Sequence, residues 1–265
     1  MSMKTDSDYI WQHLAALPVF RALIRSIEHH LLADYKPFPA PILDVGAGDG
    51  HFAAAALGPF VDVGVDVSLA SLREAQQHQV YHHLLSSSAT DLPFPTESFA
   101  TVISNCVIEH IPDLTATLAE MYRTLRPGGI LLLTVPTNQL ERNLIIPRIL
   151  RGLRLYAIAD AYIAWFRRVQ VHYHLLSREH WVEALTDRGF HVMTHRGYMS
   201  VRATQFNELW HYAGWPNVLS RRLTGRWVIW AWRPRFFLIV RLLRKFVNEP
   251  EHTDDSCLFL VARKP

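Results

Sequence analysis

The stretch ILDVGAGDG, residues 42–50, is the part of the chain that decides the fold. An apolar run of strand character ends in a glycine-rich turn, and a helical pattern begins at Phe52. Gly46 and Gly48 can adopt backbone angles closed to other residues, and they let a ligand approach the main chain closely. The pattern is therefore typical of the first strand, turn and helix of a doubly wound α/β fold, with a small-molecule site at the turn.

Short apolar runs alternate with helical patterns beyond this stretch. The alternation predicts an α/β fold, in which a doubly wound, mostly parallel sheet of seven strands carries helices on both faces. The expected strands are 42–45, 61–65, 84–85 with their flanks, 101–104, 130–135, 190–195 and 258–262. The expected helices between them are 52–57, 69–78, 114–125 and one that Ser177 caps and Gly189 ends.

The remaining segments predict the domain organisation. Apolar residues at helical spacing, interrupted by Pro18, give an N-terminal helical cover over residues 1–36. Residues 37–265 form the main domain, and two insertions interrupt its regular rhythm. One is an arginine- and leucine-rich helical lid at 138–171, and the other is a Trp/Arg-rich insertion at 199–256.

Composition limits the class of protein and its compartment. A chain of 265 residues with 49% hydrophobic and 19% charged residues is neither disordered nor fibrous. Its two cysteines lie in apolar runs, which excludes a disulfide framework and favours a reducing, cytoplasmic compartment. We find neither a signal-peptide pattern nor a stretch apolar enough to span a membrane.

Charge divides the chain into an acidic and a basic part. Up to Leu140 there are 7 Lys and Arg against 14 Asp and Glu, and beyond it there are 20 against 10. This asymmetry suggests an anionic partner for the C-terminal part. Residues 226–247 combine indoles with a helix that is apolar on one side and basic on the other. The residues that carry this pattern are Trp227, Trp230, Trp232, Leu238, Ile239, Arg241, Leu242, Leu243, Arg244, Lys245 and Phe246.

Two interpretations of residues 226–247 stay open. The apolar side packs on the domain, or it meets a membrane surface or a lipid-linked substrate, which would place the protein at the inner membrane surface. Contact with nucleic acid is disfavoured, because a broad aliphatic face along one helix suits lipid better than stacked bases.

A second acidic position follows the glycine turn. The next strand ends in VGVDVS, and this places Asp66 where doubly wound folds hold a ribose diol. Dinucleotide sites use GxGxxG, with the helix N-terminus facing a pyrophosphate, whereas this chain has GAGDG and an acidic Asp49 there. The spacing favours a cationic nucleoside without phosphates, such as S-adenosylmethionine, and disfavours a nicotinamide-dependent oxidoreductase.

Five motifs in order carry a resemblance to a known family. They are ILDVGAGDG, GVDVS, SSATDLPFPTESFATVISNCVIEHIPD, MYRTLRPGGILLLTVP and LSREHWVEALTDRGFHV. Together they resemble the class I S-adenosylmethionine-dependent methyltransferases, in particular the small-molecule members with a Rossmann-like seven-stranded sheet. The resemblance implies an enzyme that binds S-adenosylmethionine through Asp44, Gly46, Ala47, Gly48, Asp66, Val67, Ser88, Ala89, Asn105 and Cys106. Ser88 departs from the family pattern, which usually has a carboxylate at the adenine edge.

Methyl transfer needs a positioned nucleophile more than a dedicated base, but an oxygen acceptor can use a nearby histidine. The candidates are His110, His172 and His174. Some related quinone-pathway enzymes bind a metal with an additional Glu three residues before the Glu of the EH pair. Cys106 occupies that position here, so we expect no metal.

The function expected from the sequence is methyl transfer to a small-molecule or lipid-linked acceptor, at oxygen. The alternative is a catalytically silent S-adenosylmethionine-binding protein, or a membrane-associated regulatory protein. The sequence leaves the acceptor and the oligomeric state open.

Overall fold

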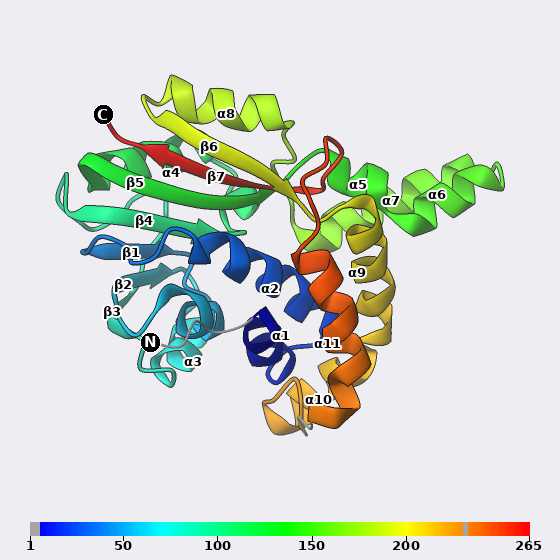
Figure 1. Ribbon diagram of the computed structural model, residues 1–265. Coiled ribbons are helices and arrows are strands. Elements are labelled where there is room, and N and C mark those ends of the chain that lie inside the picture. Colours follow the sequence, from blue (N-terminus) through cyan, green and yellow to red (C-terminus); the bar gives the residue numbers. More distant parts are fainter. Residues whose placement is uncertain (1–5, 230–232) are drawn as a thin grey trace.

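The computed structural model describes residues 6–229 and 233–265, and a seven-stranded sheet lies at its centre (Figure 1). The strand order is β3-β2-β1-β4-β5-β7-β6. The strands are β1 (Ile42–Val45), β2 (Val61–Asp66), β3 (Tyr81–Ser86), β4 (Phe99–Asn105), β5 (Leu125–Pro136), β6 (His191–Tyr198) and β7 (Cys257–Arg263). β7 lies between β5 and β6 and runs antiparallel to both. The predicted seven strands are confirmed, and the sheet is mixed because of this last strand.

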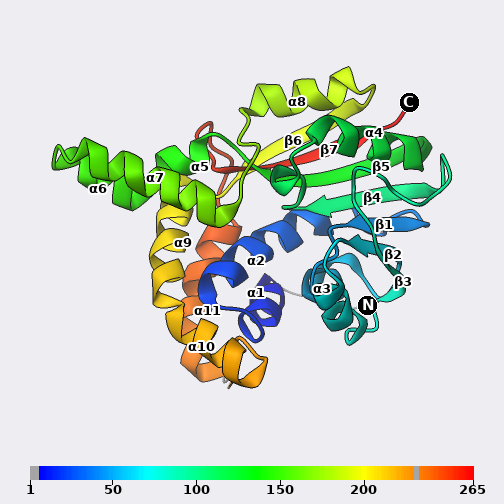
Figure 2. The ribbon, with the colours of Figure 1, turned by 180° about the vertical axis from the view of Figure 1, so that it is seen from behind.

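Helices surround the sheet and extend beyond one end of it (Figures 1 and 2). The longer ones are α1 (Asp6–Leu14), α2 (Val19–Ala33), α3 (Leu69–Gln76), α4 (Leu114–Thr124), α5 (Gln139–Asn143), α6 (Ile145–Gly152), α7 (Tyr156–Gln170), α8 (Arg178–Asp187), α9 (Val201–Ala213), α10 (Trp215–Thr224) and α11 (Arg233–Val247). Two short turns are η1 (Ala53–Leu57), which is π-helical, and η2 (Ile108–His110), which is 3-10.

The register of the central strands positions the candidate site. Asp44 of β1 pairs with Gly64 of β2, and Val45 pairs with Val65, so the two parallel strands end side by side. Every residue of β1 is buried, because helices cover both faces of the sheet there. The glycine turn after β1 and Asp66 at the end of β2 therefore meet at one edge of the sheet.

Two apolar clusters fill the two faces of the sheet. One joins the sheet to the cover helices α1 and α2 and to α11, through residues such as Leu23, Ile27 and Leu243. The other lies under α4 and α8 and includes Met121 and Trp181. The cover helices are thus part of the core, and they lie beside the carboxyl ends of the strands (Figure 1).

The helix ends follow the sequence patterns, and the segment 52–57 departs from its expected form. Ser177 caps α8 by accepting a hydrogen bond from the His180 amide at 3.3 Å, and Gly189 follows the helix with a φ of +95°, as predicted. Pro18 separates α1 from α2. The segment expected as a helix at 52–57 forms a π-helical turn instead, in which the alanines Ala53 and Ala56 are buried. Small side chains allow this turn to lie close to the cover helices.

The two predicted insertions are helical. Residues 138–171 form α5, α6 and α7, and α6 with the adjoining end of α7 projects away from the sheet in both views (Figures 1 and 2). This projecting part does not cover the glycine turn, so a lid role for 138–171 stays a prediction. Residues 199–256 contain α9, α10 and α11, while Trp230 and Trp232 lie outside the described residues.

None of the helices in the described ranges, 6–229 and 233–265, combines the length and apolarity that crossing a bilayer requires.

Candidate functional site

The glycine turn is held against the end of β2 by backbone hydrogen bonds. The amides of Gly46 and Ala47 both donate to the carbonyl of Val65, at 2.8 and 2.9 Å. Gly46 has a φ of +84°, and a Cβ there would lie 2.3 Å from a methyl group of Val107. Only glycine fits this position, because both the backbone angle and the space exclude a side chain.

Asp66 fixes the far side of the same turn. Its Oδ2 accepts a hydrogen bond from the Gly48 amide at 2.9 Å, and its Oδ1 accepts one from the Ser68 amide at 2.8 Å. A carboxylate has about four acceptor positions, so two remain for hydroxyl groups of a ligand. The carboxylate expected to hold a ribose thus lies directly beside the glycine turn.

A cavity of about 320 Å³ opens above the turn. Its lining includes Asp44, Gly46, Ala47, Gly48 and Asn105, five of the residues that the sequence places near a cofactor. Gly48 has a φ of +54°, and a Cβ there would meet no atom closer than 3.9 Å, so its Cα side faces open space. The volume is of the size that small-molecule sites occupy.

Asp44 is buried at the floor of the cavity. Its Oδ2 accepts a hydrogen bond of 2.5 Å from the Tyr81 hydroxyl. The ring of Tyr81 reaches this place because Gly64 has no side chain, and a Cβ there would lie 2.7 Å from the ring. Burial raises the pKa of Asp44 to about 6, although the Tyr81 hydrogen bond acts in the opposite direction.

Asn105 and Cys106 end β4 in a buried hydrogen-bond network. The Asn105 amide nitrogen donates to Glu28 at 2.9 Å, and its oxygen accepts from Thr134 at 2.8 Å. The Cys106 thiol donates to Glu28 at 3.0 Å, and burial raises the pKa of this thiol well above its ordinary value. A thiol held in this way is not a nucleophile at neutral pH, and of these two residues Asn105 alone lines the cavity.

Five of the predicted cofactor residues are not in the lining of the cavity. Besides Asp66 and Cys106 these are Val67, which is 73% exposed just beyond β2, and Ser88 and Ala89 after β3. Ser88 is exposed and shares a hydrogen bond of 2.7 Å with Thr90. The assignment of Ser88 and Ala89 to the adenine edge of the cofactor therefore stays a prediction.

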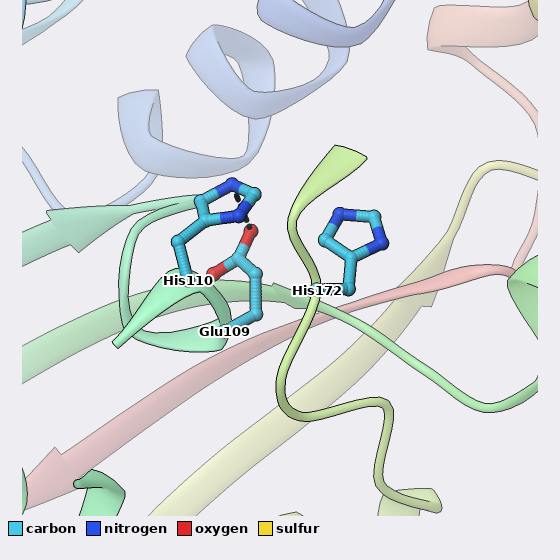
Figure 3. Close-up of side chains that lie close together, drawn as sticks. All are labelled: Glu109, His110 and His172. Atoms are coloured by element: carbon cyan, nitrogen blue, oxygen red, sulfur yellow. Dashed lines mark ion pairs between the residues drawn. The ribbon is translucent and has the colours of Figure 1, made fainter. Parts of the chain in front are cut away.

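Glu109, His110 and His172 lie together beyond the end of β4 (Figure 3). Glu109 and His110 come from η2, and His172 comes from the segment that follows α7. One ligand-type atom from each lies within 4.8 Å of the others, a spacing that could hold a metal ion. Sequence reasoning did not foresee this cluster, because His172 is distant along the chain. The expectation that no metal binds stays a prediction.

Burial sets the protonation of this cluster. Glu109 is 1% exposed, and burial raises its pKa to about 8, so it is protonated at neutral pH. Burial, together with the neighbouring His110, lowers the pKa of His172 to about 4. The two imidazole rings stack at a centroid distance of 5.1 Å. Glu109 and His172 are therefore both uncharged at neutral pH.

The third histidine candidate is separate from this pair. His174 Nε2 lies 3.0 Å from the carbonyl of Ile111 and 3.1 Å from that of Pro112, so this nitrogen is the donor. His110 makes a similar contact of 3.1 Å to the carbonyl of Val171. None of the three histidine candidates belongs to the lining of the cavity above the glycine turn.

The structure adds three arginines that sequence reasoning missed. Arg21 and Arg25 come from α2, and Arg221 comes from α10. All three line the cavity above the glycine turn. Their only sequence signal is the excess of basic residues beyond Leu140, and that signal covers Arg221 alone.

Comparison with known proteins agrees with this geometry. A family model described as "Methyltransferase domain" matches residues 17–195, which is more than half of the chain. The chain is 34% identical over 114 residues to a malonyl-[acyl-carrier protein] O-methyltransferase of Serratia marcescens, covering 42% of this chain and 44% of that protein. It is 27% identical over 168 residues to a demethylmenaquinone methyltransferase of Paenarthrobacter aurescens, covering 58% of this chain and 64% of that protein.

A solved structure shares the fold over nearly the whole chain. It is a Thermotoga maritima protein described as an S-adenosylmethionine-dependent methyltransferase and possible histamine N-methyltransferase. It aligns with a TM-score of 0.54 at 16% identity and covers 92% of this chain and 91% of the other. The matches to the two curated relatives, by contrast, span less than two thirds of the length of those proteins.

Proposed function

This chain belongs to the methyltransferase domain family, and on that premise we propose that it transfers a methyl group to a small-molecule or lipid-linked acceptor, at an oxygen atom. Its methyl donor is S-adenosylmethionine. The observation that carries the proposal is the cavity above the glycine turn, which Asp66 borders through its hydrogen bond to Gly48.

The residues at the turn fit the donor. Asp66 retains acceptor positions for a diol, and Gly48 leaves the approach to the main chain open. Asp44 on the floor supplies a carboxylate whose charge suits a cationic ligand. No pyrophosphate at the glycine turn is needed to explain these groups, and the acidic Asp49 at the start of the following turn would oppose one there.

When bound, S-adenosylmethionine supplies an electrophilic methyl group on a sulfonium. The chain's own contribution is to position the acceptor in line with that group and to exclude water. The cover helices α1 and α2 do this, because they pack over the carboxyl ends of the strands, and Leu23 of α2 and Leu17 of the turn between the two helices are buried in the same apolar cluster. An acceptor must therefore enter between the cover helices and the elements beside them.

A base for an oxygen acceptor has two candidates in the cluster beyond β4. His110 is partly exposed, with 39% of its side chain accessible, and its Nε2 lies 3.7 Å from a Glu109 carboxyl oxygen. His172 is neutral at physiological pH, because burial lowers its pKa to about 4, and this makes it the weaker base. We assign the base to His110 and a carbonyl-anchoring role to His174.

The relatives support an oxygen acceptor attached to a larger carrier or to an apolar group. One is named for O-methylation of a malonyl group on acyl-carrier protein, and the other for methylation of demethylmenaquinone. Helix α11 supports access to such an acceptor at a membrane surface. Its Phe237, Leu238 and Leu242 are exposed beside basic residues, whereas Leu243 and Val247 are buried. We propose that residues 226–247 make this peripheral contact.

The experiment is calorimetric titration of the protein with S-adenosylmethionine, its demethylated product and a nicotinamide dinucleotide. We expect the sulfonium nucleoside and its product to bind and the dinucleotide not to bind. The Asp66→Ala variant should bind the nucleosides about 10- to 100-fold more weakly, because a charge-assisted hydrogen bond is lost. Asp187→Ala, exposed on α8, is the matched control. Unchanged affinity in Asp66→Ala would refute the placement of the nucleoside.

Measurement of methyl transfer distinguishes an enzyme from a catalytically silent S-adenosylmethionine-binding protein. With an acceptor in hand, His110→Ala should lower kcat about 100-fold and leave nucleoside affinity unchanged, as expected for loss of a general base. Nucleoside binding without methyl transfer to any acceptor in a lipid or acyl-carrier extract would favour a regulatory binding protein.

A further inference from the structure

The arginines of the cavity differ in how their charges are balanced. Arg25 donates to Glu28 at 2.6 Å, and Arg221 forms an ion pair with Glu74 at 2.5 Å. Arg21 has no carboxylate within ion-pair distance among the described residues, and no hydrogen bond of its guanidinium is found there. One guanidinium in the cavity is therefore uncompensated.

The second feature of Arg21 is that it is partly buried beside another cation. Burial lowers the pKa of Arg21, and the neighbouring charge of Arg25 lowers it further, while Asp49 acts in the opposite direction. The Oδ1 of Asp49 accepts a hydrogen bond from the His51 amide at 3.2 Å. An arginine stays charged at neutral pH even so. A partly buried cation without a partner calls for an anion.

A second wall of the site carries further donors. Trp227 contacts both Arg21 and Arg221, because each guanidinium carbon is 5.4 Å from the centre of the Trp227 ring. The indole Nε1 of Trp227 is buried and has no hydrogen-bond partner among the described residues. Two guanidinium groups thus lie against one indole whose N–H is unpaired among the described residues, and all three groups are donors of the kind that a carboxylate or phosphate accepts from.

A second cavity adjoins the cavity above the glycine turn. A space of about 750 Å³ shares Leu17, Asp49 and Arg221 with the cavity above the glycine turn, and it runs on to Trp227 and Ile229. Arg221 and Trp227 come from the part of the chain beyond residue 195, where the family match ends. The glycine turn, in contrast, lies within the match. Arg221 and Trp227 therefore lie beyond the part of the chain that the family model covers, whereas Arg21 lies within it.

We propose that Arg21, with Arg221 and Trp227, binds an anionic group of the acceptor, a carboxylate or a phosphate. This inference rests on the proposed function, because it places the anionic group of the acceptor where the two cavities meet, at Arg221, which lines both, between Arg21 of the first cavity and Trp227 of the second. The acceptor is then an anionic small molecule, or one whose carrier presents an anionic group near the reacting oxygen.

The test is calorimetric titration of inorganic phosphate and of malonate, a small dicarboxylate, into protein saturated with S-adenosylhomocysteine. The wild type should bind at least one of them saturably. Arg21→Gln should weaken that binding about tenfold or more, since a charge-assisted hydrogen bond is lost. Arg21→Lys should retain part of it, because the charge remains. Arg222→Gln removes the same charge from the same helix as Arg221, but it is exposed and lines neither cavity, so it should bind like the wild type.

In the Arg21 variants, which change the lining of the first cavity, affinity for S-adenosylhomocysteine should fall far less than affinity for the anions, and in Arg222→Gln it should equal that of the wild type. If Arg21→Gln weakens the homocysteine nucleoside as much as the anions, Arg21 serves the carboxylate of the methyl donor and the proposal is wrong. It is also wrong if neither anion saturates the wild type, or if Arg21→Gln binds them normally. If the nucleoside does not bind the wild type at all, the proposed function fails, while titration of the anions into the free protein still tests Arg21.

Discussion

At the scale of single residues, the buried carboxylate of Glu28 connects the cover helices to the sheet. Glu28 is fully buried, and its oxygens accept hydrogen bonds from four side chains. The donors are Arg25 at 2.6 Å, Asn105 at 2.9 Å, Cys106 at 3.0 Å and Tyr198 at 3.0 Å. A carboxylate satisfied in this way holds α2 in place over the ends of β4 and β6.

Removing this charge should destabilise the protein. Glu28→Gln keeps the shape but leaves the guanidinium of Arg25 without its counter-ion in a buried place, which costs about 3 kcal/mol of unfolding free energy. Denaturant unfolding at neutral pH measures this loss. Glu183→Gln, exposed on α8, should change the unfolding free energy by less than about 0.5 kcal/mol. Equal unfolding free energies for the two variants would show that the hydrogen bonds to Glu28 do not stabilise the packing of the cover helices.

The same residue shows where sequence reasoning about the site ends. The glycine turn and Asp66 are recognisable because they are close in sequence and their strands are neighbours. Glu28 lies 77 residues from Asn105 and 170 residues from Tyr198, and no local pattern links them. The unpaired Arg21 is hidden for the same reason, since its neighbours Arg221 and Trp227 come from another part of the chain.

At the scale of elements, a chain of three imidazoles joins the cover helices to the segment after the glycine turn. His13 of α1 lies 3.1 Å from His51 through Nδ1 and 3.3 Å from His29 of α2 through Nε2. Neutral imidazoles can form such a chain, because each has one donor and one acceptor nitrogen. Burial, followed by the charges of its neighbours, lowers the pKa of His13 to about 2.

Acid should therefore loosen the cover. The pKa of His13 is lower in the folded state than its ordinary value of 6.5, so its contribution to stability is present above pH 6.5 and is lost as the pH falls towards 2. Between pH 8 and pH 5 this loss amounts to about 2 kcal/mol. In His13→Gln, the unfolding free energy should fall by that much less over the same interval. Denaturant unfolding at the two pH values measures the slope, and His180→Gln, exposed on α8, should keep the wild-type slope. An identical slope in His13→Gln would contradict this account.

The elements themselves were largely predictable, because apolar runs and capping residues are local signals. All seven expected strands are present, and β4 extends the expected 101–104 by only a few residues at its ends. The π-helical form of η1 was not predictable, since it depends on close packing against α2. The projection of α6 away from the sheet was equally hidden, because the sequence shows an apolar stripe but not the surface that it meets.

At the scale of the whole molecule, exposed apolar side chains lie beside basic ones on α11 and on the projecting α6. On α11 they include Phe237, Leu238 and Leu242, and on the projecting α6 and its following turn they include Ile149, Leu153 and Leu155. The sequence offered packing and membrane contact as alternatives for α11. The structure shows that one side of α11 packs, through Leu243 and Val247, while the other side stays exposed.

Vesicle binding distinguishes these two surfaces. Neutralising Arg241, Arg244 and Lys245 on the exposed side of α11 should weaken association with anionic vesicles about 100-fold, because each basic residue near such a surface contributes about 1 kcal/mol. Co-sedimentation with phosphatidylglycerol-containing vesicles measures this. The matched variant neutralises Arg148, Arg151 and Arg154, which carry the same charge on the projecting α6 and its following turn and are also exposed. We expect it to bind like the wild type.

If only the variant with Arg148, Arg151 and Arg154 neutralised loses binding, the membrane contact lies on α6. If the wild type does not bind vesicles, the basic side of α11 is simply hydrated, and an acceptor must reach the cavity from solution.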